Sequence, residues 1–167
     1  MTRTNAQYEL MDRVIAWLAA GAQHHTFANG TDLTGFHFEN WLGHPEDNTC
    51  GTTGCIAGAA VQFATEGAHS IKVGTSYNIV TAEQEFDNFG QYAADHLGLT
   101  DDEKKLLFYP FDLEDFQLAD MGYPYFKALR PPACGQLEWT RDLNPEQIAT
   151  VLQHFNTTGE IVWELVA

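Results

Sequence analysis

Residues 55–64 read C-I-A-G-A-A-V-Q-F-A and carry a single polar side chain, that of Gln62. A helix that is apolar on every side has to be surrounded by protein, so this stretch predicts a central buried helix. The side chains from Ala57 to Ala60 are small, which lets neighbouring elements approach closely. Gly67 is a natural end for this helix, because glycine takes the left-handed conformation that often closes one. We therefore expect the rest of the chain to pack around residues 55–64.

Four further helices are predicted, one before this stretch and three after it. Two have apolar side chains three or four positions apart, the spacing of an amphipathic helix, and cover residues 6–20 and 83–97. Two others start with a capping box, in which the cap residue and the residue three positions later satisfy each other's backbone amides. The two boxes are Thr100 with Glu103 and Asn144 with Gln147.

Short strands are predicted where apolar and polar side chains alternate. Residues 36–39 alternate in this way, residues 70–80 fit one or two strands or a hairpin, and residues 161–165 alternate as a terminal strand. The fold class that follows is helix-dominated α+β, with four or five helices around a central buried small-residue helix and a few short antiparallel strands, one of them C-terminal. Since the chain has no internal repeat or linker, we expect a single domain over residues 1–167.

The chain is strongly acidic, with 8 Lys and Arg against 23 Asp and Glu and a formal net charge of -15. Such a charge repels a phosphate backbone and removes the counterion release behind most nucleic-acid affinity, so direct binding of DNA or RNA is not expected. No apolar run approaches the roughly 20 residues of a membrane span, and residues 1–10 lack the apolar segment of a secretory signal. We expect a cytoplasmic protein whose three cysteines stay reduced.

The residues just before the buried helix form a candidate binding site. Backbone amides and the positive end of a helix dipole are expected to converge there and to hold an anion, such as a phosphate or carboxylate of a nucleotide-like ligand. The same field would lower the pKa of Cys55 and make its thiolate a candidate nucleophile of a hydrolase or transferase, with one of the seven histidines as base. The candidate ligand-binding residues are Gly51, Thr52, Thr53, Gly54 and Cys55.

The same residues also have a purely structural interpretation. In it, the two glycines shape a tight turn, Thr52 or Thr53 caps the helix, and Cys55 packs as a small apolar side chain. A P-loop is excluded, because residues 51–55 contain no lysine.

Zinc binding is a further alternative for this region. Nitrogen and sulfur ligands lie close together in the sequence, and tetrahedral zinc accepts such a set. The two cysteines have the spacing C-x4-C, which is looser than the usual C-x2-C pair, so we expect no cofactor and keep zinc as an alternative. The candidate zinc ligands are His37, His44, Cys50 and Cys55.

An acidic and aromatic segment, residues 83–120, is the candidate protein-binding surface. It holds 11 of the 23 acidic residues and only two lysines. Its negative potential would steer it towards a basic partner, such as the channel of a host nuclease or defence complex. The plainer interpretation is a solvated surface that confers solubility. The candidate partner-binding residues are Glu83, Glu85, Asp87, Asp101, Asp102, Asp112, Glu114 and Asp115.

Residues 50–58 have the form C-G-T-x-x-C-x-A-G. On this motif, on A-A-D-H-L-G-L-T at residues 93–100 and on T-T-G-E at residues 157–160, the chain resembles a set of uncharacterised small proteins of actinobacteria and bacteriophages. The resemblance covers most of the chain from Trp41 onward and implies no particular activity. It implies an accessory protein of a phage or mobile element, which would act in the cytosol of the host cell.

The function expected from these features is binding and sequestration without catalysis. The ligand would be either a small anion at residues 51–55 or a host protein on the acidic segment. The alternatives are a hydrolase or transferase that uses Cys55, and a structural component of a larger assembly.

Overall fold

The computed structural model describes residues 3–36, 42–43, 52–67, 69–73, 76–80, 85–86, 89–110, 113, 115–121, 137, 140 and 142–167. The helices in these ranges are α1 (Asn5–Ala19), α2 (Ile56–Ala64), α3 (Phe89–Leu97), α4 (Asp101–Phe108), α5 (Asp115–Asp120), α6 (Pro145–Thr158) and the 3-10 helix η3 (Trp163–Val166). The strands are β1 (His25–Thr26), β2 (Asp32–Phe36), β3 (Leu42–Gly43), β4 (Thr52–Gly54), β5 (His69–Val73), β6 (Ser76–Val80) and β7 (Glu85–Phe86).

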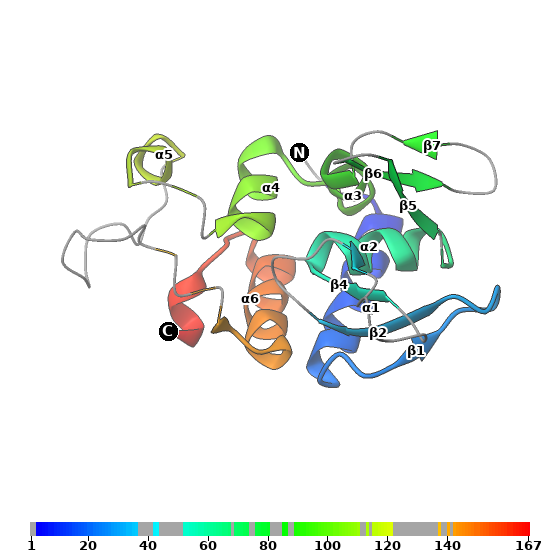
Figure 1. Cartoon of the computed structure of the whole chain (residues 1–167). Coiled ribbons are helices and arrows are strands. Elements are labelled where there is room, and N and C mark those ends of the chain that lie inside the picture. Colours follow the sequence, from blue (N-terminus) through cyan, green and yellow to red (C-terminus); the bar gives the residue numbers. More distant parts are fainter. Residues whose placement is uncertain are drawn as a thin grey trace.

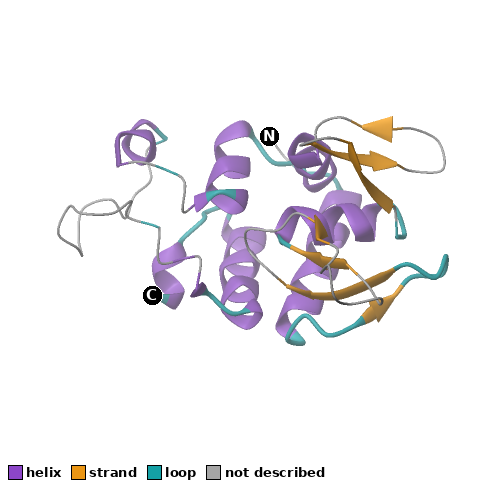
Figure 2. Cartoon of the chain, in the orientation of Figure 1, coloured by secondary structure: helices purple, strands orange, loops and turns teal. Residues whose placement is uncertain are grey.

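The fold is helix-dominated α+β, as the sequence predicts. Helices α1 and α6 pack side by side, and α2 and α3 pack against each other and against α1 (Figure 1). The strands gather at one end of the molecule, whereas α4, α5 and α6 lie towards the other end (Figure 2). The region where α1, α2 and α3 meet therefore lies between the strands and the remaining helices.

Helix α2 is the buried centre that the sequence predicts. All of its residues from Ile56 to Phe63 are buried, including Gln62. Large, fully buried side chains from other helices belong to the same core, among them Met11 of α1 and Phe155 of α6. The small residues of α2 allow close packing but bury little apolar area themselves. The larger apolar side chains of the other helices therefore contribute more of the hydrophobic stabilisation.

The strands form two small sheets. In the first, the order is β1-β2-β4-β3, and in the second it is β5-β6-β7. Strands β5 and β6 pair antiparallel, so of the alternatives for residues 70–80 the structure has the hairpin, which begins at His69. One pair differs from the expectation of antiparallel strands, because β2 and β4 are parallel. Strand β4 lies between these two neighbours and pairs antiparallel with β3 on its other edge.

Both predicted capping boxes are confirmed. The side chains of Thr100 and Asn144 accept hydrogen bonds from the backbone of Glu103 and Gln147, which return them, so both capping boxes form. Gly159 ends α6 in the left-handed conformation, with φ of 80°. No helix in the described ranges is long and apolar enough to cross a membrane.

The helix predicted over residues 83–97 begins later than expected. Its first described residue is Phe89, and residues 85–86 form strand β7, which pairs with β6. The aromatic residues at positions 86 and 89 are three positions apart, a spacing that favours a helix over a strand. The pairing with β6 decides between the two, because it satisfies backbone groups that the sequence pattern alone does not assign.

The predicted C-terminal strand is wrong. Residues 163–166 form the 3-10 helix η3, and Ile161, Val162 and Trp163 are buried one after another. In a strand, successive side chains point to opposite faces, so three consecutive buried residues require either a strand covered on both faces or a chain that bends. Here the chain bends, and the buried indole of Trp163 donates a hydrogen bond to the backbone oxygen of Leu106 in α4 (2.9 Å).

Candidate functional site

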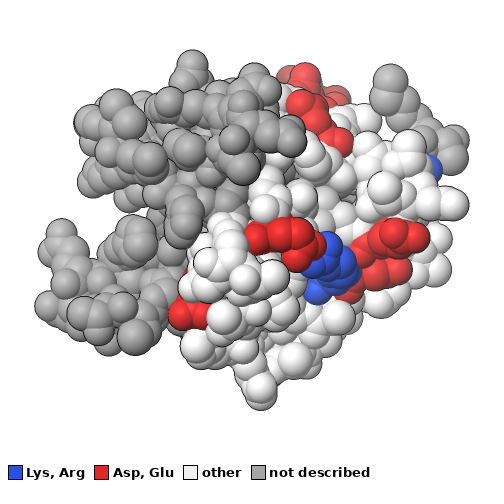
Figure 3. All heavy atoms as spheres, turned by 90° about the vertical axis from the view of Figure 1, so that its right-hand side faces the viewer, with Lys and Arg blue, Asp and Glu red and all other residues white. Residues whose placement is uncertain are grey.

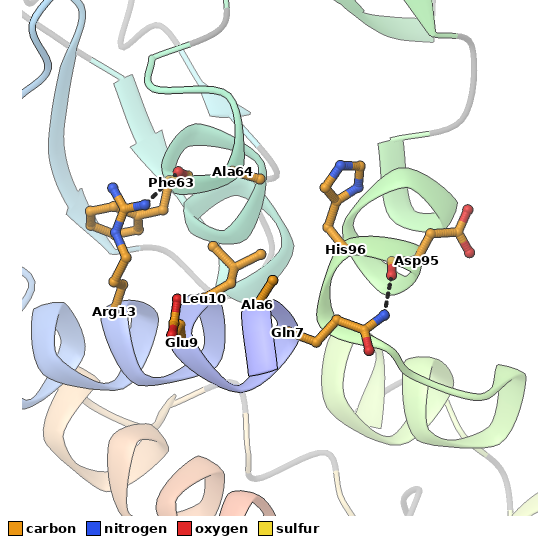
Figure 4. A pocket seen from close by; sticks show the side chains of 9 residues that line it. All are labelled: Ala6, Gln7, Glu9, Leu10, Arg13, Phe63, Ala64, Asp95 and His96. Carbon is orange, nitrogen blue, oxygen red and sulfur yellow. Dashed lines mark hydrogen bonds between the residues drawn. The ribbon is translucent and has the colours of Figure 1, made fainter. Parts of the chain in front are cut away.

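A pocket of about 440 Å³ opens between α1, α2 and α3 (Figure 4). This volume falls within the range that small-molecule sites usually occupy. Helix α1 forms one wall, and the C-terminal ends of α2 and α3 form the others. The lining residues are Ala6, Gln7, Glu9, Leu10 and Arg13 of α1, Phe63 and Ala64 of α2, and Asp95 and His96 of α3.

The floor of the pocket is apolar. Leu10 is 7% exposed and Phe63 is 4% exposed, so both belong to the core and only a small part of each side chain lines the pocket. Ala6 and Ala64 add small apolar surfaces on either side. On α1, residues 6, 10 and 13 share one face because they are spaced at three and four positions. The pocket thus combines an apolar base with polar groups on its rim.

Gln7 joins the two facing walls. Its Oε1 accepts a hydrogen bond from the backbone of Thr4 (2.8 Å), as part of the capping box that starts α1. Its Nε2 donates to the backbone oxygen of Asp95 near the end of α3 (3.0 Å). Gly98 makes room for this contact, because a Cβ there would lie 2.6 Å from Gln7 Oε1. One side chain therefore fixes the start of α1 against the end of α3.

Arg13 already has partners within the protein. Its Nη1 donates to the backbone oxygen of Phe63 (3.1 Å), and its Nη2 pairs with Oε1 of Glu66 (2.8 Å). The guanidinium also lies over the Phe63 ring, 5.1 Å from its centroid. Figure 4 shows the side chain lying along α2 instead of reaching across to α3. Its positive charge is therefore compensated by Glu66.

His96 presents a hydrogen-bond acceptor to the pocket. Its Nδ1 lies 2.9 Å from the backbone oxygen of Tyr92, and its ring stacks on the Tyr92 ring at 4.1 Å between centroids. A carbonyl oxygen can only accept, so Nδ1 carries the proton, and Nε2 of the neutral ring is an acceptor. In Figure 4 the imidazole extends from α3 into the space in front of α2. The stacking and the hydrogen bond hold the ring in this orientation.

The remaining carboxylates of the pocket are those of Glu9 and Asp95. Glu9 is exposed and makes no hydrogen bond or ion pair in the part of the chain that the structure describes. Asp95 accepts a hydrogen bond from Gln91 (2.8 Å), and its carboxylate points to the far side of α3 in Figure 4. The acceptors open to a ligand are thus the Glu9 carboxylate and His96 Nε2. Such a pair is suited to a ligand that donates hydrogen bonds and carries positive charge.

The residues predicted to bind an anion have a different local structure from the expected open loop. Thr52–Gly54 form β4, whose backbone pairs with β2 on one side and with β3 on the other. The N-cap of α2 is Cys55, not Thr52 or Thr53, and no side chain caps the helix. Gly51 lies outside the described residues, so the anion site as a whole stays a prediction.

The expected lowering of the pKa of Cys55 is wrong. Cys55 is 5% exposed, and burial raises the pKa of its thiol to about 11, although the backbone amides of Gly58 and Ala57 act in the opposite direction. The cost of removing a thiolate from water therefore exceeds the stabilisation by the helix N-terminus. This environment favours the structural interpretation, in which Cys55 packs as a small apolar side chain.

In the folded protein, Cys55 is expected to react with iodoacetamide at least about 100-fold more slowly at about pH 8 than after unfolding. The reason is that the thiol ionises near pH 11 when folded and near pH 9 when exposed, so the reactive thiolate is far scarcer in the native state. Mass spectrometry with peptide fragmentation measures the label on Cys55 in native and guanidinium-treated protein, with N-acetylcysteine as a reference thiol. Similar native and unfolded rates would restore Cys55 as a nucleophile candidate.

The proposed zinc ligands cannot be assembled from the described residues. His37, His44 and Cys50 lie outside them, and Cys55 is buried. Among the side chains that the structure does describe, no three of the His, Cys, Asp and Glu groups gather closely enough to hold a metal ion. Zinc binding stays an untested alternative.

The predicted acidic surface is described only in part. Asp101 and Asp102 are exposed in the first turn of α4, where negative charge stabilises a helix. Lys104 lies 2.9 Å from Asp101, and this hydrogen bond and charge hold the pKa of Asp101 below its ordinary value. Glu85 is part of β7, and Asp115 is the first residue of α5. The other predicted positions, Glu83, Asp87, Asp112 and Glu114, lie outside the described residues.

A second polar cluster lies on β1 and β2, where His24, Thr26 and Asp32 meet. Oδ1 of Asp32 accepts from Thr26 Oγ1 (2.7 Å) and lies 3.0 Å from His24 Nε2. The hydrogen bonds to His24 and then Thr26 lower the pKa of Asp32. The composition is that of a hydrolytic triad, but the geometry is not, because the hydroxyl donates to the carboxylate and both contacts use the same His24 nitrogen. The cluster ties the start of β1 to β2.

The pocket residues Glu9 and His96 were not predicted from the sequence. The helical spacing of residues 6, 10 and 13 is a usable signal, since it places a partly polar stripe beside the apolar one. His96 was one of seven histidines without diagnostic spacing. What makes it a candidate is its position opposite α1, which depends on how α3 packs.

Comparison of the chain with protein-family models, with curated proteins and with solved structures found no match.

Proposed function

We propose that this protein acts by binding a basic partner protein, which it blocks or sequesters, without catalysing a reaction. The observation that carries the proposal is the hydrogen-bonding character of the α1–α2–α3 pocket. Its open polar groups, on Glu9 and His96, are acceptors, whereas its guanidinium is already paired with Glu66. A partner with positively charged side chains supplies the donors that these groups lack.

The charge of the protein supports the same partner. Its net charge of -15 produces a long-range attraction for basic surfaces and speeds their encounter. Figure 3 shows one face on which acidic groups outnumber basic ones and flank the basic patch near its middle. Two of the described basic side chains, Arg13 and Lys104, are paired with the carboxylates of Glu66 and Asp101. The positive charges of Arg13 and Lys104 are therefore balanced by these two carboxylates and do not offset the charge of the other acidic residues.

The resemblance to bacteriophage proteins supports a host protein as the partner. A protein made by a phage or mobile element gains from blocking a basic channel or nucleic-acid-binding surface of the host, and an acidic face competes for such a surface directly. A small anion is the weaker ligand for this pocket, since the charge around it would repel the anion.

A fluorescein-labelled decalysine peptide provides the first test, with fluorescence anisotropy of the full-length protein as the measurement. Binding is expected to weaken as salt is added, because the attraction is electrostatic. The double variant Glu9→Gln with His96→Leu, which removes both open acceptors, is expected to bind about tenfold more weakly than the wild type. The matched control is Glu146→Gln with His154→Leu, which makes the same two changes at positions that do not line the pocket.

The control variant is expected to keep an affinity close to that of the wild type. Equal losses in the two double variants would mean that only the net charge attracts the peptide, and the proposal would then lack a localised binding face. An absence of salt-sensitive binding would overturn the proposed function as a whole.

A further inference from the structure

The turn between β1 and β2 contains the dipeptide Asn29-Gly30. We infer that Asn29 is a site of covalent modification, at which a spontaneous deamidation converts the side-chain amide to a carboxylate. The product, an aspartate or an isoaspartate, releases this turn from the end of α2. The modification is independent of the proposed partner, because neither residue lines the α1–α2–α3 pocket.

The reaction needs only the neighbouring backbone and water. The backbone nitrogen of Gly30 loses its proton and bonds to Cγ of Asn29. The bond from Cγ to Nδ2 then breaks, and Nδ2 leaves with a proton as ammonia. Water opens the resulting five-membered imide at either of its two carbonyl carbons, which gives an aspartate or an isoaspartate. No electrons are transferred, since the net change is the hydrolysis of an amide to a carboxylic acid and ammonia.

Glycine at position 30 leaves the attacking nitrogen unshielded. It has no Cβ, and nothing lies within 4 Å of the position that a Cβ would occupy. Asn29 and Gly30 are both exposed, so water reaches the amide and the imide. Asparagine is also among the chemically labile residues of proteins. The turn therefore provides the nucleophile, the leaving group and access for water.

Two other asparagines lack this combination and serve as internal references. Asn144 is followed by Pro145, whose nitrogen carries no hydrogen and cannot attack. Asn156 lies within α6, where the helix fixes its backbone, and the β-branched Thr157 follows it. Because all three asparagines belong to one chain, their reactions can be compared in a single sample.

Hydrogen bonds in the folded protein hold both nitrogens of the reaction. Nδ2 of Asn29 donates to the backbone oxygen of Gly67, which follows α2 (2.7 Å). The backbone nitrogen of Gly30 donates to the oxygen of Phe27 (2.9 Å). Oδ1 of Asn29 accepts from the backbone nitrogen of Thr31 (2.9 Å). The turn has to open before Gly30 attacks, so we expect the reaction to be slower in the native protein than in the unfolded chain.

The product loses the contact with the end of α2. Nδ2 of Asn29 is a donor, whereas a carboxylate only accepts, and so does the oxygen of Gly67 that it would meet. The side chain packs directly on this glycine, since Oδ1 lies 2.6 Å from the position that a Cβ of Gly67 would occupy. In an isoaspartate the backbone also gains one carbon atom, which alters the turn itself. Each modified molecule therefore has a β1–β2 turn that is no longer bonded to Gly67.

The first test follows the full-length protein over time in a mildly alkaline buffer. Mass spectrometry of its peptides, with fragmentation, measures the mass increase at each asparagine. We expect Asn29 to react at least about tenfold faster than Asn156, and Asn144 not to react by this route. The same measurement in urea is expected to give a several-fold higher rate at Asn29. Equal rates in native and unfolded protein would show that the hydrogen bonds of the turn do not protect it.

A variant of the glycine tests the route itself. Gly30→Ala shields the attacking nitrogen and is expected to slow the reaction at Asn29 at least about tenfold. The matched control is Gly159→Ala, because Gly159 also has a positive φ and open space around its Cβ position. It carries the same backbone strain but is expected to leave the rate at Asn29 unchanged. Equal rates at Asn29 in the two variants overturn the assignment of this site.

The consequence of the modification is tested with Asn29→Asp, which has the side chain of one product. Its midpoint of urea unfolding is expected to lie below that of the wild type, because the bond to the Gly67 oxygen is lost. The control Asn5→Asp makes the same chemical change at an exposed position in the first turn of α1 and is expected to unfold like the wild type. Equal midpoints for the two variants overturn the release of the turn.

Discussion

Replacing Trp163 with alanine is expected to lower the free energy of unfolding by about 3–5 kcal/mol. Trp163 is fully buried, so its removal leaves a large cavity beside α4 and α6. It also removes the hydrogen bond from the indole nitrogen to the backbone oxygen of Leu106 (2.9 Å). In an α-helix that oxygen would accept from the residue four positions later, which here is Pro110 and has no amide hydrogen.

Urea unfolding followed by circular dichroism measures this loss. Trp163→Phe keeps most of the volume but leaves the Leu106 oxygen without its donor, and we expect it to cost about 1–3 kcal/mol. The control is Leu165→Ala in the same 3-10 helix, since Leu165 is 49% exposed and its loss is expected to cost less than about 1 kcal/mol. A Trp163→Ala variant as stable as the control would show that the C-terminal residues do not pack onto α4.

Replacing Gly67 with alanine is expected to cost about 2–5 kcal/mol of folding free energy. Gly67 has φ of +91°, which an alanine adopts only with strain, and a Cβ there would lie 2.9 Å from Cβ of Phe27 and 2.6 Å from Oδ1 of Asn29. Phe27 cannot easily retreat, because its ring packs against Phe63 with centroids 5.5 Å apart. Asn29 would have to give up its hydrogen bond to the Gly67 oxygen (2.7 Å).

Gly159→Ala is the matched control for this prediction. Gly159 also follows a helix in the left-handed conformation, but nothing lies within 4 Å of the position that its Cβ would occupy. The control therefore measures the backbone strain alone, about 1–2 kcal/mol. The difference between the two variants in thermal or urea unfolding reports the close approach of the β1–β2 turn to the end of α2. Equal losses would mean that this contact contributes nothing to stability.

Features that depend on residues close together in the chain could be predicted from the amino-acid sequence. A capping box joins residues three positions apart, so Thr100 with Glu103 and Asn144 with Gln147 could be recognised from spacing. The burial of α2 followed from composition, because ten residues with one polar side chain have no face suited to water.

Features whose partners are distant in the chain could not be predicted in this way. T-T-G at residues 52–54 is a strand because β2 and β3 lie on either side of it, and neither neighbour is encoded locally. The thiol of Cys55 has a raised pKa because surrounding residues exclude water from it, an effect that outweighs the local field of the helix.

The same reason explains the C-terminus and the pocket. The alternation in residues 161–165 fits a strand, but the unpaired oxygen of Leu106 and the indole of Trp163 satisfy each other across 57 positions and bend the chain instead. Glu9 and His96 line one pocket because α1 packs against α3, and the Gln7 side chain also joins these helices over a separation of 88 positions. Local spacing determines where capped helices start and which helix faces are buried. Hydrogen-bond donors and acceptors that are not paired within one helix or strand are paired only when the whole chain has folded.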